Sequence, residues 1–469
     1  MTVLSFGFFL LSFVIIGLLS VLRRQETGVD YLLAGHEVKP WLVALSAVAT
    51  NNSGYMFIGM IGFTYTYGLS SVWLMLGWIV GDFLMSLLVH KKLRVTTEAH
   101  DRHSFAGALS SWHGGDYRLL RLAGGVLTVL FLGTYAAAQL NAGSKALHVL
   151  FGWEYGVGAV AGAAIVLLYC FAGGIRASIW TDAAQSMVMI CAMGLMLWVA
   201  LGQLGGWRLF GAGLAGVSPH YMDWFPSDLG PGGPILFVTG WLFAGAAVIG
   251  QPHIMVRFMA MDDPEHMGRV RTYYYGWFTA FYALTICVGL AARLLLPEIT
   301  EFDAELALPT LAGELLPPVL TGLVLAGLFA ATISTADSQI LSCTAAVTRD
   351  FPYRQLHGYA ATKLATVFVT LLALGIALSQ NESVFSLVLI AWSALASAFG
   401  PLMIVYALNW KPSQPLALVM MLTGVAVVLL WRYLSWDQTI VYEVMPGMLS
   451  GIAVFLIGRA LGSAEAVRN

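Results

Sequence analysis

The chain has 469 residues, 59% of them apolar and only 10% charged, and its mean hydropathy is +0.79. Soluble domains carry roughly 25% charged residues, so this composition excludes an ordinary globular protein and indicates a polytopic membrane protein. The net charge of −2 provides no basic surface for nucleic acid. The sequence contains no phosphate loop, nucleophile motif or metal motif, so we expect no enzyme, and no obligate protein partner is evident.

A membrane-crossing helix needs about 20 apolar residues, and about thirteen segments of the chain meet this requirement. We interpret the first as a retained span and not a signal peptide, because no basic stretch precedes it and no small-residue cleavage site follows it. The expected spans are residues 3–22, 41–66, 70–90, 119–149, 155–173, 178–204, 235–259, 272–296, 315–346, 359–380, 384–408, 415–433 and 441–462. The sequence therefore predicts an all-α bundle surrounded by lipid, without a soluble domain.

Lysine and arginine are enriched in cytoplasmic loops, and this bias gives the expected orientation. With the N-terminus outside, nearly all of the 23 Lys and Arg residues fall on the inner side, and only Arg208, Arg293 and Arg432 fall in outer loops. The sequence thus predicts a protein of a bacterial-type inner (plasma) membrane with its C-terminus in the cytoplasm. Arg257 is among the residues expected to face the cytoplasm.

Two of the expected spans look interrupted. Poor helix formers occupy residues 49–54 in the middle of the second span, and Gly250-Gln251-Pro252-His253 interrupts the seventh. Unwound backbone at membrane depth frees carbonyl groups for a cation and N–H groups for a carboxylate, and paired interruptions point to a transporter binding site. The alternative is two ordinary kinks, in which His253 is a helix-end histidine with satisfied nitrogens.

A polar face crosses the ninth span. Four small residues share this face at helical spacing, and they are Ala331, Ser334, Thr335 and Ser338. Asp337 lies at its edge, and a carboxylate at membrane depth costs roughly 2.5–3.5 kcal/mol, so the face is expected to look into the protein. Asn52 and Ser334 reach the same depth, roughly 16–18 Å from the inner surface. Their hard oxygen atoms suit Na⁺, although a polar seam between packed helices is the alternative.

A set of motifs, in order along the chain, carries a family resemblance. They are Asp30 to Gly35 with Ser46 to Gly54; Trp180-Thr181-Asp182 with Gln185; Gly250 to Ile254; Arg257 to Ala260; Ser334-Thr335 with Ser338-Gln339; and Ala391-Trp392-Ser393 with Phe399-Gly400-Pro401. Together they cover about residues 30–410 and resemble the sodium:solute symporter family, most closely its sodium/proline symporter branch.

The resemblance implies a LeuT-type fold, which is built from two inverted five-helix repeats. The single transporter domain, 1–469, would then consist of an extra N-terminal helix at 3–22, a first repeat at 41–204, a second repeat at 235–408, and two extra helices at 415–462. The resemblance also implies Na⁺ as the coupling ion. By motif position, its ligands would be the backbone carbonyls of Ala49, Asn52 and Ala331 and the hydroxyls of Ser334 and Thr335.

Some members of the family hold a second sodium ion at an Asp that corresponds to Asp182. The matching positions on the ninth span are Asp337 and Ser338, so a carboxylate replaces a serine there. Two nearby carboxylates repel each other unless a cation or proton lies between them. We therefore hypothesise a second cation site, or a proton site, at Asp182, Asp337 and Ser338. The alternative for Asp182 is a cap near the inner end of its helix.

The resemblance also places solute contacts around the two breaks. The expected residues are Asn51, Ser53, Gly54, Tyr135, Gln139, Trp241, Ala244, Val248, Gln251 and Pro252. Ala244 and Val248 replace a Trp and a Tyr of the proline branch, and Asn51 replaces an Asp. The pocket is thus expected to be less aromatic, and a somewhat larger amino acid or a small organic anion is as consistent as proline.

The sequence as a whole predicts a secondary active transporter that couples inward Na⁺ movement to uptake of a small organic solute by alternating access. Two alternatives remain open. One is a proton-coupled permease of the same fold, which Asp337 favours. The other is a nutrient sensor, against which we expect that the short segment after the last span leaves no room for an output domain.

Overall fold

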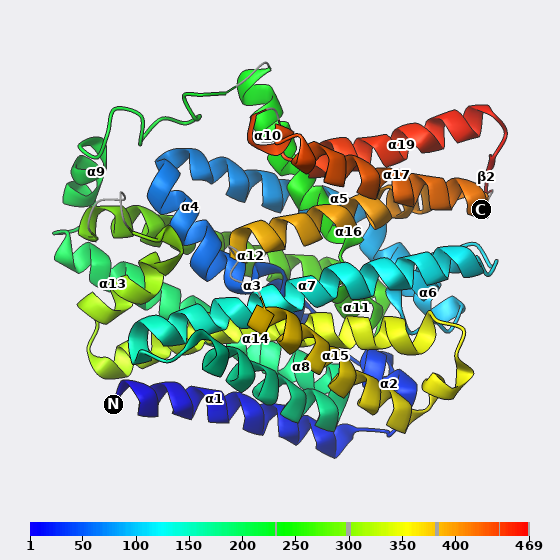
Figure 1. Ribbon diagram of the computed structural model, residues 1–469, viewed down its shortest axis with the longest axis horizontal. Coiled ribbons are helices and arrows are strands. Elements are labelled where there is room, and N and C mark those ends of the chain that lie inside the picture. Colours follow the sequence, from blue (N-terminus) through cyan, green and yellow to red (C-terminus); the bar gives the residue numbers. More distant parts are fainter. Residues whose placement is uncertain (230–231, 297–301, 380–383, 440, 468–469) are drawn as a thin grey trace.

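The computed structural model describes residues 1–229, 232–296, 302–379, 384–439 and 441–467, which form a helical bundle. Most long helices run along the long axis of Figure 1, with the N-terminus and the C-terminus toward opposite ends of that axis. The α-helices are α1 (Thr2–Leu19), α2 (Gly28–Leu33), α3 (Pro40–Gly54), α4 (Met60–Tyr67), α5 (Val72–Ala99), α6 (Phe105–Ser110), α7 (Arg118–Phe151), α8 (Tyr155–Gln203), α9 (Trp207–Ala215), α10 (Gly233–Ala246), α11 (Pro252–Met259), α12 (Met267–Leu295), α13 (Ala307–Leu315), α14 (Pro318–Arg349), α15 (Tyr359–Ser379), α16 (Val384–Ala407), α17 (Gln414–Tyr433), α18 (Trp436–Thr439) and α19 (Val444–Ala460).

Short elements connect these helices. A single turn of π-helix, η3 (Tyr55–Gly59), joins α3 to α4, and the 3₁₀ segments η4 (Gly68–Ser71) and η5 (Ala247–Gly250) follow α4 and α10. The two strands β1 (Trp410–Pro412) and β2 (Ala464–Ala466) pair antiparallel, with Lys411 opposite Glu465.

The number of membrane spans agrees with the sequence prediction. Within the described residues, ten continuous helical stretches are long and apolar enough to cross a membrane. Two of them bend back within the stretch, at Gly68 (φ +70°) and at Gly174 (φ +57°), where only glycine adopts this backbone without strain. Dividing these two, and adding the shorter α19, gives the thirteen spans expected.

The first predicted break is present. Ser53, near the end of α3, has φ +50° and ψ −178°, which is not helical, and the chain then continues through η3 into α4. A positive φ at a non-glycine residue is uncommon and is concentrated at functional sites. All residues from Ala49 to Gly59 are buried, so this irregular backbone does not meet lipid.

The second predicted break is also present. Helix α10 tightens into η5, Gln251 adopts an extended conformation (φ −100°, ψ 100°), and α11 begins at Pro252. Proline at this position lacks the N–H that would have continued the helix, and the residue before proline is restricted to extended conformations. Both interruptions therefore follow from local sequence.

Helix α14 lies at the centre of the bundle. It packs against α7, α8, α3 and α1, and nearly every residue from Thr321 to Ala346 is buried. Small side chains permit this close packing; a Cβ on Gly327, for example, would lie 2.9 Å from Cβ of Ala192. The polar face predicted for this helix thus looks into the protein and not into lipid.

Close packing of α5 on α10 gives a test of the fold. A Cβ at Gly81 would lie 2.1 Å from the carbonyl oxygen of Leu242, whereas Gly194 has open space around it. Because added volume in a packed interior costs about 1–3 kcal/mol, Gly81→Ala is expected to lower the melting temperature of the purified protein. Gly194→Ala, the matched control, is expected to leave it unchanged or raise it. Equal melting temperatures for the two variants would contradict the packing described.

Candidate ion and solute site

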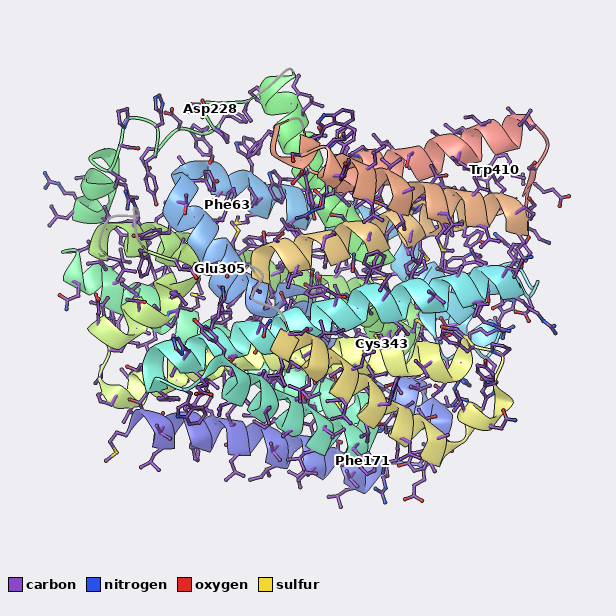
Figure 2. All side chains as sticks on the ribbon, viewed as in Figure 1. Phe63, Phe171, Asp228, Glu305, Cys343 and Trp410 are labelled. Atoms are coloured by element: carbon purple, nitrogen blue, oxygen red, sulfur yellow. The ribbon has the colours of Figure 1, made fainter. Side chains whose placement is uncertain are left out.

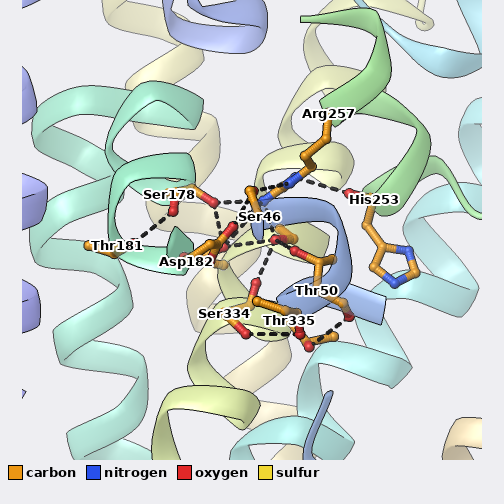
Figure 3. A network of polar contacts seen from close by, with 12 residues as sticks. Ser46, Thr50, Ser178, Thr181, Asp182, His253, Arg257, Ser334 and Thr335 are labelled. Carbon is orange, nitrogen blue, oxygen red and sulfur yellow. Dashed lines mark hydrogen bonds and ion pairs between the residues drawn. The ribbon is translucent and has the colours of Figure 1, made fainter. Parts of the chain in front are cut away.

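The hydroxyls of α14 face the backbone that precedes the break in α3. Ser334 Oγ donates toward the carbonyl oxygens of Ala49, at 3.4 Å, and Ala331, at 3.1 Å. Thr335 Oγ1 lies 3.0 Å from the Thr50 carbonyl oxygen and 3.1 Å from that of Ala331. Figure 3 shows these two hydroxyls beneath Thr50. Five oxygen atoms from two distant helices therefore converge, fully buried, at one point.

Four of the five sodium ligands expected from the sequence belong to this group. Asn52 is the exception, because its contacts stay within its own segment: Nδ2 donates to the Val48 carbonyl at 2.6 Å, and its carbonyl accepts from the Tyr55 N–H. The Thr50 carbonyl, which was not among the expected ligands, belongs to this group.

A second polar group surrounds the guanidinium of Arg257, which is fully buried (Figure 3). Its Nη2 lies 3.3 Å from Asp182 Oδ2 and 3.7 Å from Asp337 Oδ1. The same nitrogen donates to Ser178 Oγ at 2.7 Å and to Ser338 Oγ. Our expectation that Arg257 faces the cytoplasm was therefore wrong: the break at Gln251 directs α11, and with it the arginine, into the bundle.

The two carboxylates of the hypothesised second site are thus held on either side of a cation that belongs to the protein. Asp182 accepts a 2.6 Å hydrogen bond from Ser46, and Asp337 accepts bonds from Tyr169, at 2.5 Å, and Ser178, at 2.7 Å. Two carboxylates share one guanidinium, which leaves an excess of one negative charge when both are ionised. The alternative that Asp182 caps a helix end is not supported, because its contacts are with the side chains of Ser46 and Arg257.

Ser338 connects the two groups. Its hydroxyl donates to the Ser334 carbonyl at 2.5 Å, lies 3.1 Å from Thr50 Oγ1, and accepts from Arg257. A shift of α14 at Ser334 would therefore also change the hydrogen bond between Ser338 and Arg257. The hypothesis of a second cation or proton site stays a prediction.

Around the first break, four of the expected solute residues contact one another. Gln139 Oε1 accepts a 2.8 Å hydrogen bond from the Gly54 N–H, and the Tyr135 hydroxyl is hydrogen-bonded to the Ser53 side chain. Ser53 Oγ also accepts from the Tyr55 N–H at 3.0 Å. Tyr135 and Gln139 thus hold α7 against the irregular backbone of α3.

Around the second break, the backbone contacts α16. Gln251 Nε2 donates to the Trp392 carbonyl at 2.9 Å, and Trp392 Nε1 donates to the Ala244 carbonyl at 3.1 Å. Val248 is fully buried in η5 beside them. Pro252 lies further along and lines a small cavity with Ser104 and Asp350.

His253 follows the second break and contacts Tyr135, which lies beside the first break. Its ring is fully buried and packs edge-to-face on Tyr135, with centroids 5.6 Å apart. Within the described part of the chain, neither ring nitrogen has a hydrogen-bond partner, so the expectation of satisfied nitrogens was wrong. Gln139 Nε2 and Gln251 Oε1 are also buried without partners there. Unpaired polar atoms are costly in an interior, so these three side chains are candidates for contact with a polar ligand.

Two expected solute residues lie elsewhere. Asn51 points away from α14, and its Nδ2 donates at 2.6 Å to Tyr274 OH, which in turn donates at 2.9 Å to the buried Asp82. Trp241 stacks on Tyr442, with ring centroids 5.2 Å apart, and lines a separate cavity at the end of the bundle.

The model of the sodium:solute symporter family matches residues 31–424 of the chain. The chain belongs to the sodium:solute symporter family. Members of this family are transporters, not enzymes, and couple solute movement to Na⁺. The chain is 30% identical to the sodium/proline symporter of Staphylococcus aureus, with 94% of this chain and 89% of that protein covered. It is 29% identical to the osmoregulated proline transporter OpuE of Bacillus subtilis, with 99% and 96% covered.

Among solved structures, the chain is similar to the substrate-bound, outward-open state of a Na⁺-coupled sialic acid symporter. The TM-score is 0.85 at 19% identity, with 100% of this chain and 99% of the other covered. This likeness concerns the fold alone, and it confirms the expected LeuT-type bundle of a multi-pass membrane protein.

The buried arginine gives a prediction that does not depend on transport. Removing one partner of a buried charge group leaves uncompensated charge and costs about 3–5 kcal/mol, so Arg257→Gln is expected to lower the melting temperature strongly. Adding Asp337→Asn removes one of the two orphaned charges and is expected to recover part of the loss. An unchanged melting temperature for Arg257→Gln, or a double variant less stable than the single one, would contradict the charge arrangement described.

Proposed function

We propose that this symporter couples the inward movement of Na⁺ to uptake of a small amino acid such as proline, by alternating access in a bacterial inner membrane. The orientation has the N-terminus outside and the C-terminus in the cytoplasm, with lipid around the bundle. The halves 41–204 and 235–408 act as the two inverted repeats. The observation that carries the proposal is the approach of the Ser334 and Thr335 hydroxyls to the carbonyls of the broken helix α3.

Na⁺ is cargo at this point, held by main-chain oxygens of Ala49, Ala331 and either Thr50 or Asn52, and by the two hydroxyls. Each hydroxyl oxygen lies within hydrogen-bond distance of two carbonyl oxygens, and a cation bound among them would be coordinated by the lone pairs of both hydroxyls. Oxygen donors of this kind suit Na⁺ and not soft metals. Binding would draw α14 and α3 together.

The solute is proposed to lie beside the ion, between the two breaks. The buried, unpaired atoms of Gln139, Gln251 and His253 are available to its polar groups, and Tyr135 forms one wall. Two curated relatives are described as proline transporters, which favours a small amino acid. Ala244 and Val248, which are small, favour a pocket that admits residues somewhat larger than proline.

The closed cytoplasmic end supports an outward-facing state. The segment before α3 pairs with the segment after α11: Val38 N–H donates to the Ala260 carbonyl at 3.3 Å, and Asp262 N–H donates to the Val38 carbonyl at 3.0 Å. Lys39 and Asp262 add an ion pair at 3.0 Å. Release of Na⁺ and solute into the cell requires these contacts to separate.

A proton-coupled permease is the second candidate, and one observation favours it. Asp182 and Asp337 exceed Arg257 by one negative charge in a buried setting, where an uncompensated charge is costly. A proton or a second cation at Asp182, Asp337 and Ser338 would compensate it.

The sodium site is tested by removing its hydroxyls. Ser334→Ala and Thr335→Ala are each expected to raise the Na⁺ concentration for half-maximal proline uptake at least about tenfold. Each variant removes one ligand, and a loss of about 1.4 kcal/mol of binding free energy lowers the affinity tenfold. Thr370→Ala, which removes a similar buried hydroxyl on α15, is the control. Uptake into proteoliposomes with a Na⁺ gradient measures the effect. Unchanged Na⁺ dependence in both variants would refute the site.

The coupling ion is tested by uptake at fixed pH with and without a Na⁺ gradient, across a panel of amino acids and small organic anions. Na⁺-driven symport predicts uptake that collapses without Na⁺. Uptake that is indifferent to Na⁺ but follows a pH gradient would favour the permease.

Asp337→Ser tests the second site. If a proton or second cation binds there, the variant is expected to change the ion-to-solute ratio or the pH dependence of uptake, because the excess charge is removed. Transport with an unchanged ratio and unchanged pH dependence would remove the reason for a second site.

A further inference from the structure

A cavity of about 470 Å³ opens at the end of the bundle opposite the closed cytoplasmic contacts. Its walls come from four segments that are distant in sequence: the end of α4 with η4, the loop 218–229, the first half of α10, and Asp437 with Val441 and Tyr442. Figure 2 shows two of its residues, Phe63 on α4 and Asp228 on the loop, toward the same end as the N-terminus. This volume is typical of sites for small molecules.

The floor of the cavity is a fixed aromatic pair. Trp241 and Tyr442 stack at 5.2 Å with their ring planes 24° apart, and the Tyr442 hydroxyl lies 2.9 Å from Ser393 Oγ of α16. Five further aromatic side chains line the walls: Phe63, Tyr67, Tyr221, Phe225 and Phe237. The cavity is therefore surrounded by aromatic faces and edges.

One wall is attached to the broken helix. The Tyr221 hydroxyl donates to the Thr64 carbonyl at 3.0 Å, and the Tyr221 carbonyl accepts from the Leu69 N–H at 2.9 Å. Phe225 stacks on Trp73, with centroids 5.3 Å apart and planes 16° apart. The loop thus moves with α4 and η4, and the cavity is preformed instead of depending on a loose segment.

Two carboxylates and one imidazole, that of His220, line the cavity, and His220 Nδ1 lies 2.8 Å from Asp223 Oδ2. Asp228 and Asp437 contribute carboxylates, and no Lys or Arg is among the described lining residues. Neither carboxylate forms an ion pair within the described part of the chain. Carboxylates attract cations, and aromatic faces do the same through their negative π-face. A carboxylate group on the solute would find the His220 ring and hydroxyl donors such as those of Ser70 and Ser227, but no Lys or Arg among the described lining residues.

We propose that this cavity is a recruiting site for solutes that carry a protonated nitrogen, and that it excludes organic anions that lack one. The inference rests on the proposed function in one respect, namely that solute enters from this end. It selects an amino acid over an organic anion as the class of substrate. Trp241, which was expected at the central site, instead acts in the recruiting cavity as the surface on which the ammonium group is held.

The test uses two probes that divide the chemistry of proline. Pyrrolidine keeps the cationic nitrogen without the carboxylate, and tetrahydrofuran-2-carboxylate keeps the ring and the carboxylate without the nitrogen. Binding to the purified full-length protein is measured by thermal shift in KCl without Na⁺. The cavity is expected to bind pyrrolidine and not the oxygen analogue.

Variants locate the binding. Trp241→Ala, and Asp228→Asn combined with Asp437→Asn, are expected to raise the Kd for pyrrolidine about 3- to 30-fold, because each removes a group that attracts the cation. Glu154→Gln, an exposed carboxylate away from the cavity, is the control and is expected to leave the Kd unchanged. If Trp241→Ala fails to fold, the Kd for pyrrolidine of the carboxylate variant alone decides the test.

Equal binding of both probes, no binding of pyrrolidine, or an unchanged Kd in the carboxylate variants would overturn the proposal. These outcomes are independent of the proposed function, because the assay contains no Na⁺ and measures no uptake. Absence of Na⁺-driven amino-acid uptake, with pyrrolidine still bound at the cavity, would refute the proposed function alone.

Discussion

The whole arrangement depends on irregular backbone that is held inside a membrane protein. Carbonyl groups without helical partners are tolerated at this depth only where another part of the protein, or a ligand, satisfies them. In this chain the straight helix α14 supplies the partners: its hydroxyls meet the carbonyls of Ala49 and Thr50 just before Ser53 leaves the helical conformation. The Na⁺ that we propose would take the place of these hydrogen bonds, since the oxygen atoms already lie close together. The same constraint explains why α14 is buried along most of its length.

Charge in the interior follows the same logic. Arg257 reaches the centre because α11 starts anew after the second break, and it arrives between Asp182 and Asp337. Three ionic groups from three helices then hold one another, and Ser338 connects them to the ion-facing hydroxyls. The two breaks are thus connected: the carbonyls before the first meet the hydroxyls of α14, and the second places Arg257 beside Asp182 and Asp337. Reciprocal coupling between ion and solute requires some such connection between their sites.

Much of this could be predicted from the sequence, for reasons that differ among residues. The breaks were predictable because Asn51-Asn52-Ser53-Gly54 and Gln251-Pro252 are poor helix formers in otherwise apolar spans. The hydroxyl face of α14 was predictable from helical spacing. The position of Arg257 was not, because it depends on the direction that the chain takes after Pro252. Thr50 was missed because the choice of carbonyl depends on backbone angles, and His253 because its neighbour Tyr135 lies far away in the sequence. The outer cavity could not be foreseen, since its walls combine four distant segments.

The most direct measurement of the central claim is a high-resolution experimental structure of the protein in saturating Na⁺. We expect a density peak within bonding distance of the carbonyl oxygens of Ala49 and Ala331 and of the hydroxyls of Ser334 and Thr335, with these hydroxyls turned away from the carbonyls. A structure in which the hydroxyls still donate to Ala49 and Thr50, while Na⁺ is bound elsewhere, would contradict it.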